Sequence, residues 1–413
     1  MQRLTGRTAV PLSYATFVLI GVTVGTNGVL LLAQMADYGV DRTVIGLTFF
    51  TGTAGFVLGG LATGALIHRF GTRTALAIGG CANTLAGLYM ASRPPFAAFV
   101  MVQVVTGFAG GVLESTLNVH LAELPGATGK LNRLHAFFGV GALIGPVLAA
   151  RIVAVTSWRV VWLVLAVTYI PLIVGFLLAY PGRAAAETAA GAQSAGTAGQ
   201  ADESTPARAR GLLRAALREP GVLFAAAMLS VYVGLEMGVG SWGFSYLVQA
   251  RSLSEAVAGY GVSGYWLGLT LGRFLISPIA TKIGASTAGM IYACLAGVVA
   301  TATLAWLAPG AAASGVALVL LGFCLGPIFP TTMAIVPQVA PSRLAPTAIG
   351  VINAASTVGG SALPWLAGAI GQSDGIWTLL PFTMSLGAVL FVLWRPLASR
   401  IRIPAAVSSV PTA

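Results

Sequence analysis

The chain has 413 residues, of which 57% are hydrophobic and 8% are charged. Because soluble domains carry about 25% charged residues, this composition excludes a water-soluble globular protein. The net charge of +11 comes from basic residues scattered between apolar segments, so it excludes a basic nucleic-acid-binding face and indicates the topology of a membrane protein.

Twelve segments of the chain are apolar over the length of about 20 residues that a helix needs to cross a bilayer. The first is too long for the core of a signal peptide, so we count it as a span of the mature protein. We predict an all-α membrane protein with twelve transmembrane helices in two six-helix pseudo-symmetric halves. The predicted spans lie near 12–36, 43–67, 74–92, 95–122, 133–154, 158–181, 221–249, 255–280, 285–307, 311–338, 342–371 and 375–397.

The segment between the sixth and seventh spans is rich in Ala, Gly, Ser, Thr and charged residues, which is typical of a flexible linker. Its last part, GLLRAALREP, predicts a short amphipathic helix on the membrane surface. We therefore divide the chain into an N-terminal bundle at 1–181, a cytoplasmic linker at 182–220, a C-terminal bundle at 221–400 and a cytoplasmic tail at 401–413.

Basic residues are distributed unequally between the two ends of these spans. If the N-terminus is cytoplasmic, sixteen Arg and Lys residues fall on the inner side and five on the outer side, while Arg273 lies within a span. The positive-inside rule therefore predicts that both termini face the cytoplasm of an inner (plasma) membrane protein.

The two halves repeat each other in sequence. GFVLGGLATGALIHRFG, from Gly55 to Gly71, aligns without gaps with GLTLGRFLISPIATKIG, from Gly268 to Gly284, at an offset of 213 residues. Such a duplication is a feature of secondary transporters, in which two bundles rock around a central site.

Small residues recur every four positions on the second and eighth predicted helices, which places them in a row on one face. Such a row lets helices approach closely, either as fixed packing or as a gliding contact between the halves, and both interpretations stay open. The rows are Gly55, Gly59, Gly60 and Gly64 on the second helix and Gly264, Gly268 and Gly272 on the eighth.

Two carboxylates lie deep in predicted spans, Glu114 in the fourth and Glu236 in the seventh. An ionisable group in the membrane is costly, so each is a functional candidate. Glu114 belongs to a stripe of polar and small residues with Gln103 and Asn118, which lines a cavity or a helix contact. Removal from water favours the neutral form of a carboxyl group, so Glu114 could exchange a proton or bind substrate hydroxyls. The alternative is a neutral Glu that only joins helices.

Tyr232 and Glu236 share a face of the seventh helix, ahead of Gly240 and Gly243, where the backbone could open or kink. Irregular backbone at membrane depth borders cavities. Glu236 either faces such a cavity or pairs with Arg273 of the eighth helix.

Other polar and aromatic residues complete the candidate binding set. Aromatic faces beside amides and carboxylates suit a sugar-like ligand, although an aromatic residue alone is also typical of packing or membrane anchoring. These residues are Asn27 and Gln34 on the first helix, Trp266 on the eighth and Asn353 on the eleventh.

The sequence offers little support for an enzyme. His68, His120 and His135 lie apart and lack the spacing of metal ligands, and no nucleophile accompanies a base. We expect no metal, cofactor or catalytic residue.

The turn RFGTR, from Arg69 to Arg73, resembles the signature loop between helices 2 and 3 of the major facilitator superfamily. In that loop a Gly is followed four residues later by Asp, then Arg, Gly and a basic residue. Gly64, Arg69, Gly71 and Arg73 match, whereas His68 stands where the family has Asp. The resemblance implies a twelve-helix transporter in which these residues, with Arg273, serve gating or structure.

The stretches GGVLESTLNVHLAEL and GFCLGPIFPTT are similar to the fucose permease branch and related bacterial sugar facilitators. That resemblance implies that Glu114 is the glutamate that binds substrate and proton and that Asn118 is its neighbouring amide. The branch has an acid after the Asn of helix 1, whereas Gly28 follows Asn27 here.

We expect a secondary active transporter that moves a small polar solute, a sugar or sugar derivative, by alternating access and proton-coupled symport. The alternative is a proton-driven antiporter that exports a drug or metabolite. The expected partners are the small-molecule substrate, H+ and the lipid bilayer, without nucleic acid, and we expect the protein to act as a monomer.

Overall fold

The computed structural model describes residues 2–180 and 206–401, in which long helices are joined by short turns. The helices of the first half follow the first six predicted spans, and the second span is built from two consecutive helices. They are α1 (Gln2–Tyr38), α2 (Arg42–Ile45) with α3 (Leu47–Phe70), α4 (Thr72–Ala91), α5 (Phe96–Ala122), α6 (Ala127–Val155) and α7 (Trp158–Ala179).

The second half begins after α9 (Pro206–Ala216), which lies where the short surface helix was predicted. Residues 181–205 and 402–413, which hold most of the predicted linker and tail, are outside the described residues. The helices of this half are α10 (Pro220–Ser245), α11 (Glu255–Lys282), α12 (Thr287–Leu307), α13 (Ala311–Leu325), α14 (Ile328–Ala334), α15 (Val336–Val339), α16 (Ala345–Ser373) and α17 (Leu379–Ala398).

Ten of the described helical segments are long and apolar enough to cross a membrane. The other two spans are α11, with 28 residues, and α16, with 29 residues, and both carry polar residues along their length. Both of these helices contact the opposite half, α11 through α6 and α16 through α3. Together the twelve spans confirm the predicted architecture.

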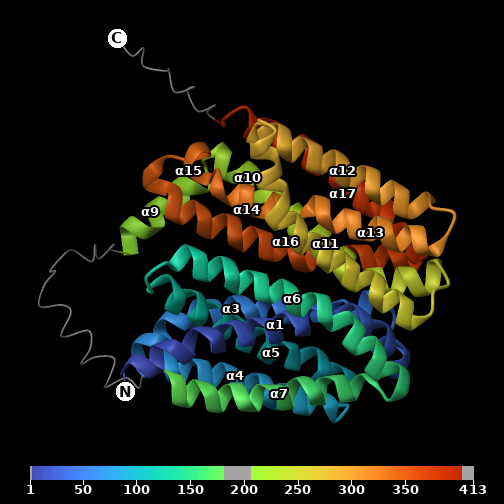
Figure 1. Cartoon of the computed structure of the whole chain (residues 1–413), viewed down its shortest axis with the longest axis horizontal. Helices are drawn as coiled ribbons and strands as arrows, with labels where there is room; N and C mark the ends of the chain where they lie inside the picture. Colours follow the sequence, from blue (N-terminus) through green and yellow to red (C-terminus); the bar gives the residue numbers. More distant parts are fainter. Residues whose placement is uncertain (1, 181–205, 402–413) are drawn as a thin grey trace, which may run out of the picture.

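The two halves use the same internal pairing of helices. In the first half α1 packs on α6 and α3 on α5, and in the second half α10 packs on α16 and α11 on α13. Figure 1 shows the halves side by side, the first in blue to green and the second in yellow-green to red, with α6 next to α11. The seam between the halves is formed by α6 with α11, α3 with α16 and α1 with α10.

Apart from Gly64, the glycines of the rows on α3 and α11 pack within their own halves. A Cβ atom at Gly55 would lie 2.0 Å from the Val104 carbonyl oxygen of α5, and one at Gly268 would lie 2.0 Å from the Val319 carbonyl oxygen of α13. These equivalent contacts favour fixed packing over a gliding contact between halves. They let the backbones touch, so each half is a closely packed unit.

Two turn glycines also repeat between the halves. Gly71, between α3 and α4, has φ = 82°, and Gly284, between α11 and α12, has φ = 70°. A side chain is disfavoured at such angles. The predicted motif turn therefore exists twice, and its glycine is required by the backbone at both sites.

The sequence suggested that the seventh helix could open or kink near Gly240 and Gly243. In the structure α10 is continuous to Ser245 and ends in a π-helical turn, Tyr246–Ala250. Both glycines are buried against neighbouring helices, so they serve close packing and the backbone hydrogen bonds stay intact. The tenth span is interrupted, because breaks separate α13, α14 and α15.

Substitution of Gly268 by Ala should lower the free energy of unfolding of the second half by about 1–3 kcal/mol, because the added methyl group overlaps the Val319 backbone. Gly64→Ala is the matched control, because no atom lies within 4 Å of a Cβ there. Thermal unfolding in detergent should show a lower midpoint for Gly268→Ala only. Equal midpoints for both variants would contradict the packing account.

Candidate functional site

Glu114 lies within the α5 span, eight residues before its end at Ala122, or about 12 Å along the helix. Its side chain is partly exposed. Among the described residues, none donates a hydrogen bond to its carboxyl group and no basic residue pairs with it. A carboxyl group that faced lipid in this state would be very costly. Glu114 therefore stays the candidate that the sequence predicted.

The other members of the predicted α5 stripe have different surroundings. The Asn118 side-chain amide donates to the Glu114 backbone carbonyl oxygen at 2.9 Å, which leaves its own oxygen as an acceptor. Gln103 is tied within its own half, since its amide contacts the Met90 sulfur and its oxygen accepts from Thr106 at 3.1 Å. Asn118 thus lies beside Glu114, whereas Gln103 lies three turns away along the helix.

Asn27 and Gln34 share a face of α1 but differ in burial. Asn27 is exposed, and Gln34 is 3% exposed with its Nε2 atom lacking a hydrogen-bond partner. Gly28 is packed against α10, where a Cβ atom would lie 2.6 Å from the Gly240 carbonyl oxygen. An acid at position 28 would therefore push the halves apart.

Glu236 is paired with Arg273, with Oε1 and Nη2 3.1 Å apart. Glu236 is 6% exposed and Arg273 is 28% exposed at the side chain. The Tyr265 hydroxyl donates to the Glu236 backbone oxygen at 3.0 Å, and the Tyr232 hydroxyl donates to the Leu325 carbonyl oxygen at 3.1 Å. The interpretation of Glu236 as an ion-pair partner is the one that matches this geometry. The pair fastens α10 to α11 within the second half.

The remaining candidates do not form one cluster. Trp266 is buried against Gly240 and Tyr265, and its Nε1 atom lacks a partner. Asn353 is exposed on α16, at the seam helix of the second half. Trp266 therefore contributes to packing, whereas Asn353 is exposed.

The predicted motif loop lies at the end of the bundle that carries α9, here called the linker end. His68 and Arg69 are exposed in the last turn of α3, and Gly64 is one turn earlier. Gly71 caps both flanking helices, and Arg73 lies in the first turn of α4. These residues are far along α3 from the contacts that join the halves at the opposite end.

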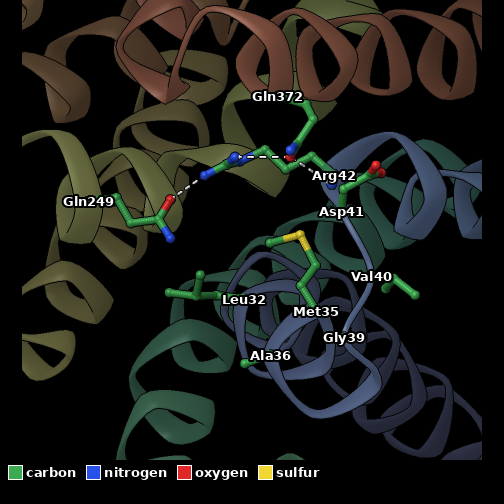
Figure 2. Close-up of a pocket in the computed structure, with 9 residues that line it drawn as sticks. All are labelled: Leu32, Met35, Ala36, Gly39, Val40, Asp41, Arg42, Gln249 and Gln372. Atoms are coloured by element: carbon green, nitrogen blue, oxygen red, sulfur yellow. Dashed lines mark hydrogen bonds between the residues drawn. The ribbon is translucent and has the colours of Figure 1, made fainter.

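The opposite end, here called the Arg42 end, holds a contact that bridges the halves. The Arg42 guanidinium donates to Gln249 Oε1, to Gln372 Oε1 at 3.3 Å and to the Gly371 carbonyl oxygen at 3.4 Å, and its backbone N–H donates to Gln372 Oε1 at 3.2 Å. Figure 2 shows Arg42 reaching between these two glutamines above a pocket of about 450 Å³. Asp41 caps α2 through the Val44 N–H, which fixes Arg42 at the first position of that helix.

Aromatic contacts close the seam beneath Arg42. The Trp365 indole donates to the Thr43 carbonyl oxygen at 3.1 Å, and its ring lies 5.8 Å from that of Phe50. Phe49 contacts Trp242 edge to face at 6.1 Å. The halves are therefore joined at the Arg42 end, while Asn353 on the same helix as Trp365 is exposed nearer the linker end.

Sequence reasoning missed this bridge. Arg42 was counted only as a basic residue outside the membrane, and Gln249 and Gln372 were not singled out. In the sequence each of these three residues looks like an ordinary residue at the end of a span. Their common role appears only in the fold, where the ends of three helical segments meet. The available signal was an arginine just after the turn that follows the first span, together with one glutamine at the same end of the seventh and eleventh spans.

Two repeated six-helix halves around a polar seam define a secondary transporter. The sequence profile of the Major Facilitator Superfamily matches residues 12–364 and 242–408, so the chain belongs to this superfamily and is a multi-pass membrane transporter. The superfamily resemblance of the helix 2 to 3 turn is confirmed.

Known proteins match over most of the chain. Bypass of stop codon protein 6 of Saccharomyces cerevisiae is 28% identical over 405 residues, which cover 91% of this chain and 79% of the yeast protein. A bacterial homologue of the human lysosomal transporter Spinster, inward-facing and occupied, has a TM-score of 0.76 at 11% identity and covers 97% of this chain and 99% of its own. The fucose:proton symporter FucP of E. coli has a TM-score of 0.60 at 17% identity, and the match covers 95% of this chain and 98% of FucP. The two structures show the fold.

Loss of one partner of the Glu236–Arg273 pair should destabilise the protein. Glu236→Gln leaves the partly exposed guanidinium without a counter-charge, which costs about 2–3 kcal/mol, whereas Glu236→Leu with Arg273→Leu removes both charges and should recover most of that loss. Denaturation midpoints in detergent measure this. A Glu236→Gln midpoint equal to that of the parent would show that the pair does not hold the helices.

Substitution of Arg42 by Ala should open the Arg42 end more often, because it removes the hydrogen bonds that join the halves. We expect labelling of Leu32→Cys by an impermeant maleimide to become about tenfold faster, because three partly exposed hydrogen bonds at roughly 0.5 kcal/mol each amount to about 1.5 kcal/mol. Leu32→Cys is introduced into a background protein in which Cys81, Cys294 and Cys324 have been replaced, so that the maleimide has one target.

The matched control is Arg159→Ala, which lies at the same end but bonds the Ala91 carbonyl oxygen of its own half. Its labelling rate should equal that of the background. If Arg42→Ala also labelled at the background rate, the bridge would not keep this end closed.

Proposed function

We propose that this protein is a proton-coupled symporter that imports a small polar solute, a sugar or sugar derivative. The observation that carries the proposal is the Glu114 carboxyl group, which is partly exposed within a span and has no hydrogen-bond or charge partner among the described residues. Such a group needs either a proton or a ligand in the membrane interior.

The two buried acids differ in what they are free to do. Glu236 already has a counter-charge in Arg273, so protonating it would break an ion pair. Glu114 has none, so a proton neutralises its charge at no such cost. A neutral carboxyl group can also donate one hydrogen bond and accept others, which suits a hydroxylated solute. We therefore assign both proton and solute binding to Glu114.

Amides on both sides of the seam supply the remaining polar contacts. Asn118 has a free side-chain oxygen beside Glu114, Asn27 is exposed on α1 and Asn353 is exposed on α16. A solute bound between the halves would meet the first two from one half and the third from the other. Neutral amides with one acid favour an uncharged polar solute, and the resemblance of the Glu114 stretch to the fucose permease branch supports a sugar.

The transport cycle follows from the seam. We place the linker end in the cytoplasm because most basic residues lie there. The bridged Arg42 end is then the outer end, and this structure is a state closed to the outside. Solute and proton would bind when the Arg42 bridge opens and leave toward the cytoplasm, and each ligand shifts the equilibrium by its differential affinity for the two states. One chain contains both halves, so a monomer suffices.

Glu114→Gln should abolish the dependence of flux on pH, because an amide cannot bind the proton. Solute uptake into proteoliposomes should fall to about a tenth or less, since a hydrogen bond that a solute hydroxyl donates to a charged group is worth about 1.5–3 kcal/mol. The assay uses a panel of monosaccharides, uronic acids and cationic dyes with the pH gradient imposed in either direction.

Glu123→Gln is the matched control, because Glu123 is an exposed acid just after α5. It should retain both flux and pH dependence. Unchanged pH dependence in Glu114→Gln would remove Glu114 from the mechanism. Flux of dyes alone, driven by an opposing proton gradient, would show the export function instead.

A further inference from the structure

A second pocket lies on the seam, between α6 and α11. It has a volume of about 580 Å³ and is lined almost entirely by apolar side chains. Ile144, Val147 and Leu148 line it from α6 and Leu267 from α11. Ile144 is 44% and Leu267 is 37% exposed, so the groove opens at the surface of the membrane-spanning region. None of the residues assigned to solute or proton binding lines it.

One end of the groove is positively charged. The Arg151 guanidinium donates to the Tyr260 hydroxyl at 3.0 Å and lies 5.9 Å from the centre of that ring. Among the described residues no carboxylate pairs with Arg151. Arg151 is four residues before the end of α6, and Tyr260 is five after the start of α11, which is the level of the membrane surface. The groove therefore has a free cation at its membrane-surface end.

A buried polar atom lies one turn deeper. Ser263 lines the groove and is 4% exposed, yet its hydroxyl group has no hydrogen-bond partner. Serine in a helix usually satisfies its hydroxyl on the carbonyl four residues earlier, and an orphaned hydroxyl in an apolar site is costly. This hydroxyl is therefore available to an acceptor on an occupant of the groove.

The order of these groups matches one kind of molecule. From Arg151 to Leu143, which also lines the pocket, α6 extends eight residues, or about 12 Å. Along this line come a cation, a free hydroxyl and a continuous apolar stripe. A phospholipid presents a phosphate, then ester carbonyls, then an acyl chain in the same order.

We propose that this groove binds an anionic phospholipid. Arg151, with Tyr260 beside it, binds the phosphate group, Ser263 donates to an ester carbonyl oxygen, and the apolar stripe from Ile144 to Leu267 packs against an acyl chain. Because α6 and α11 belong to different halves, the lipid would contact both sides of the seam. The site is separate from the proposed transport site.

The test measures lipid binding to the purified full-length protein by native mass spectrometry. Phosphatidylglycerol and phosphatidylcholine with identical acyl chains are titrated separately. The parent should bind the first phosphatidylglycerol about fivefold more tightly than phosphatidylcholine, the factor expected for one basic side chain at a lipid surface. Arg151→Gln should remove this preference. Val147→Trp, which fills the groove, should weaken binding of both lipids.

Arg159→Gln is the control for general charge, since Arg159 lies at the same end outside the groove. It should keep the preference for phosphatidylglycerol. Glycerol phosphate without acyl chains should not displace the bound lipid. The proposal is overturned if Arg151→Gln and Arg159→Gln reduce binding equally, if Val147→Trp with a parental unfolding midpoint binds both lipids as the parent does, or if glycerol phosphate displaces the lipid.

Discussion

The cost of a charge inside the bilayer governs how this protein arranges its few ionisable residues. Glu236 and Arg273 meet this cost by pairing, and the pair joins α10 to α11. Glu114 has no such partner among the described residues. The same physical penalty therefore makes one acid a structural element and leaves the other dependent on a proton or a solute.

Close glycine packing determines where the molecule can move. Gly55 and Gly268 bring helix backbones into contact at equivalent places in the two halves. Motion within a half would break these contacts, so relative motion is directed to the seam. There the halves meet through Arg42, the aromatic contacts of Trp365 and the crossing of Gly28 with Gly240. The contact of Gly28 with the Gly240 carbonyl oxygen leaves no room for a side chain, which explains why the first helix carries no acid after Asn27.

The sequence was sufficient to predict the twelve spans, the duplication and the motif turn, because hydropathy, repeats and turn glycines are local signals. It also identified Glu114 and Glu236, since acids in apolar segments are conspicuous. It could not choose between the two roles of Glu236, which depend on the distance to Arg273 in the folded protein. The Arg42 bridge was invisible because Gln249 and Gln372 are more than 120 residues apart along the chain. The helix does not open at Gly240 and Gly243, because both glycines are buried in contacts with neighbouring helices.

The central claim is that Glu114 takes up the proton that accompanies the solute. Solute-induced proton uptake can be measured directly with the purified protein in weakly buffered detergent solution, using a pH indicator. The account predicts that solute binding draws protons from solution in the parent and in Glu123→Gln, but not in Glu114→Gln. Proton uptake that persists in a Glu114→Gln protein that still binds the solute would contradict it.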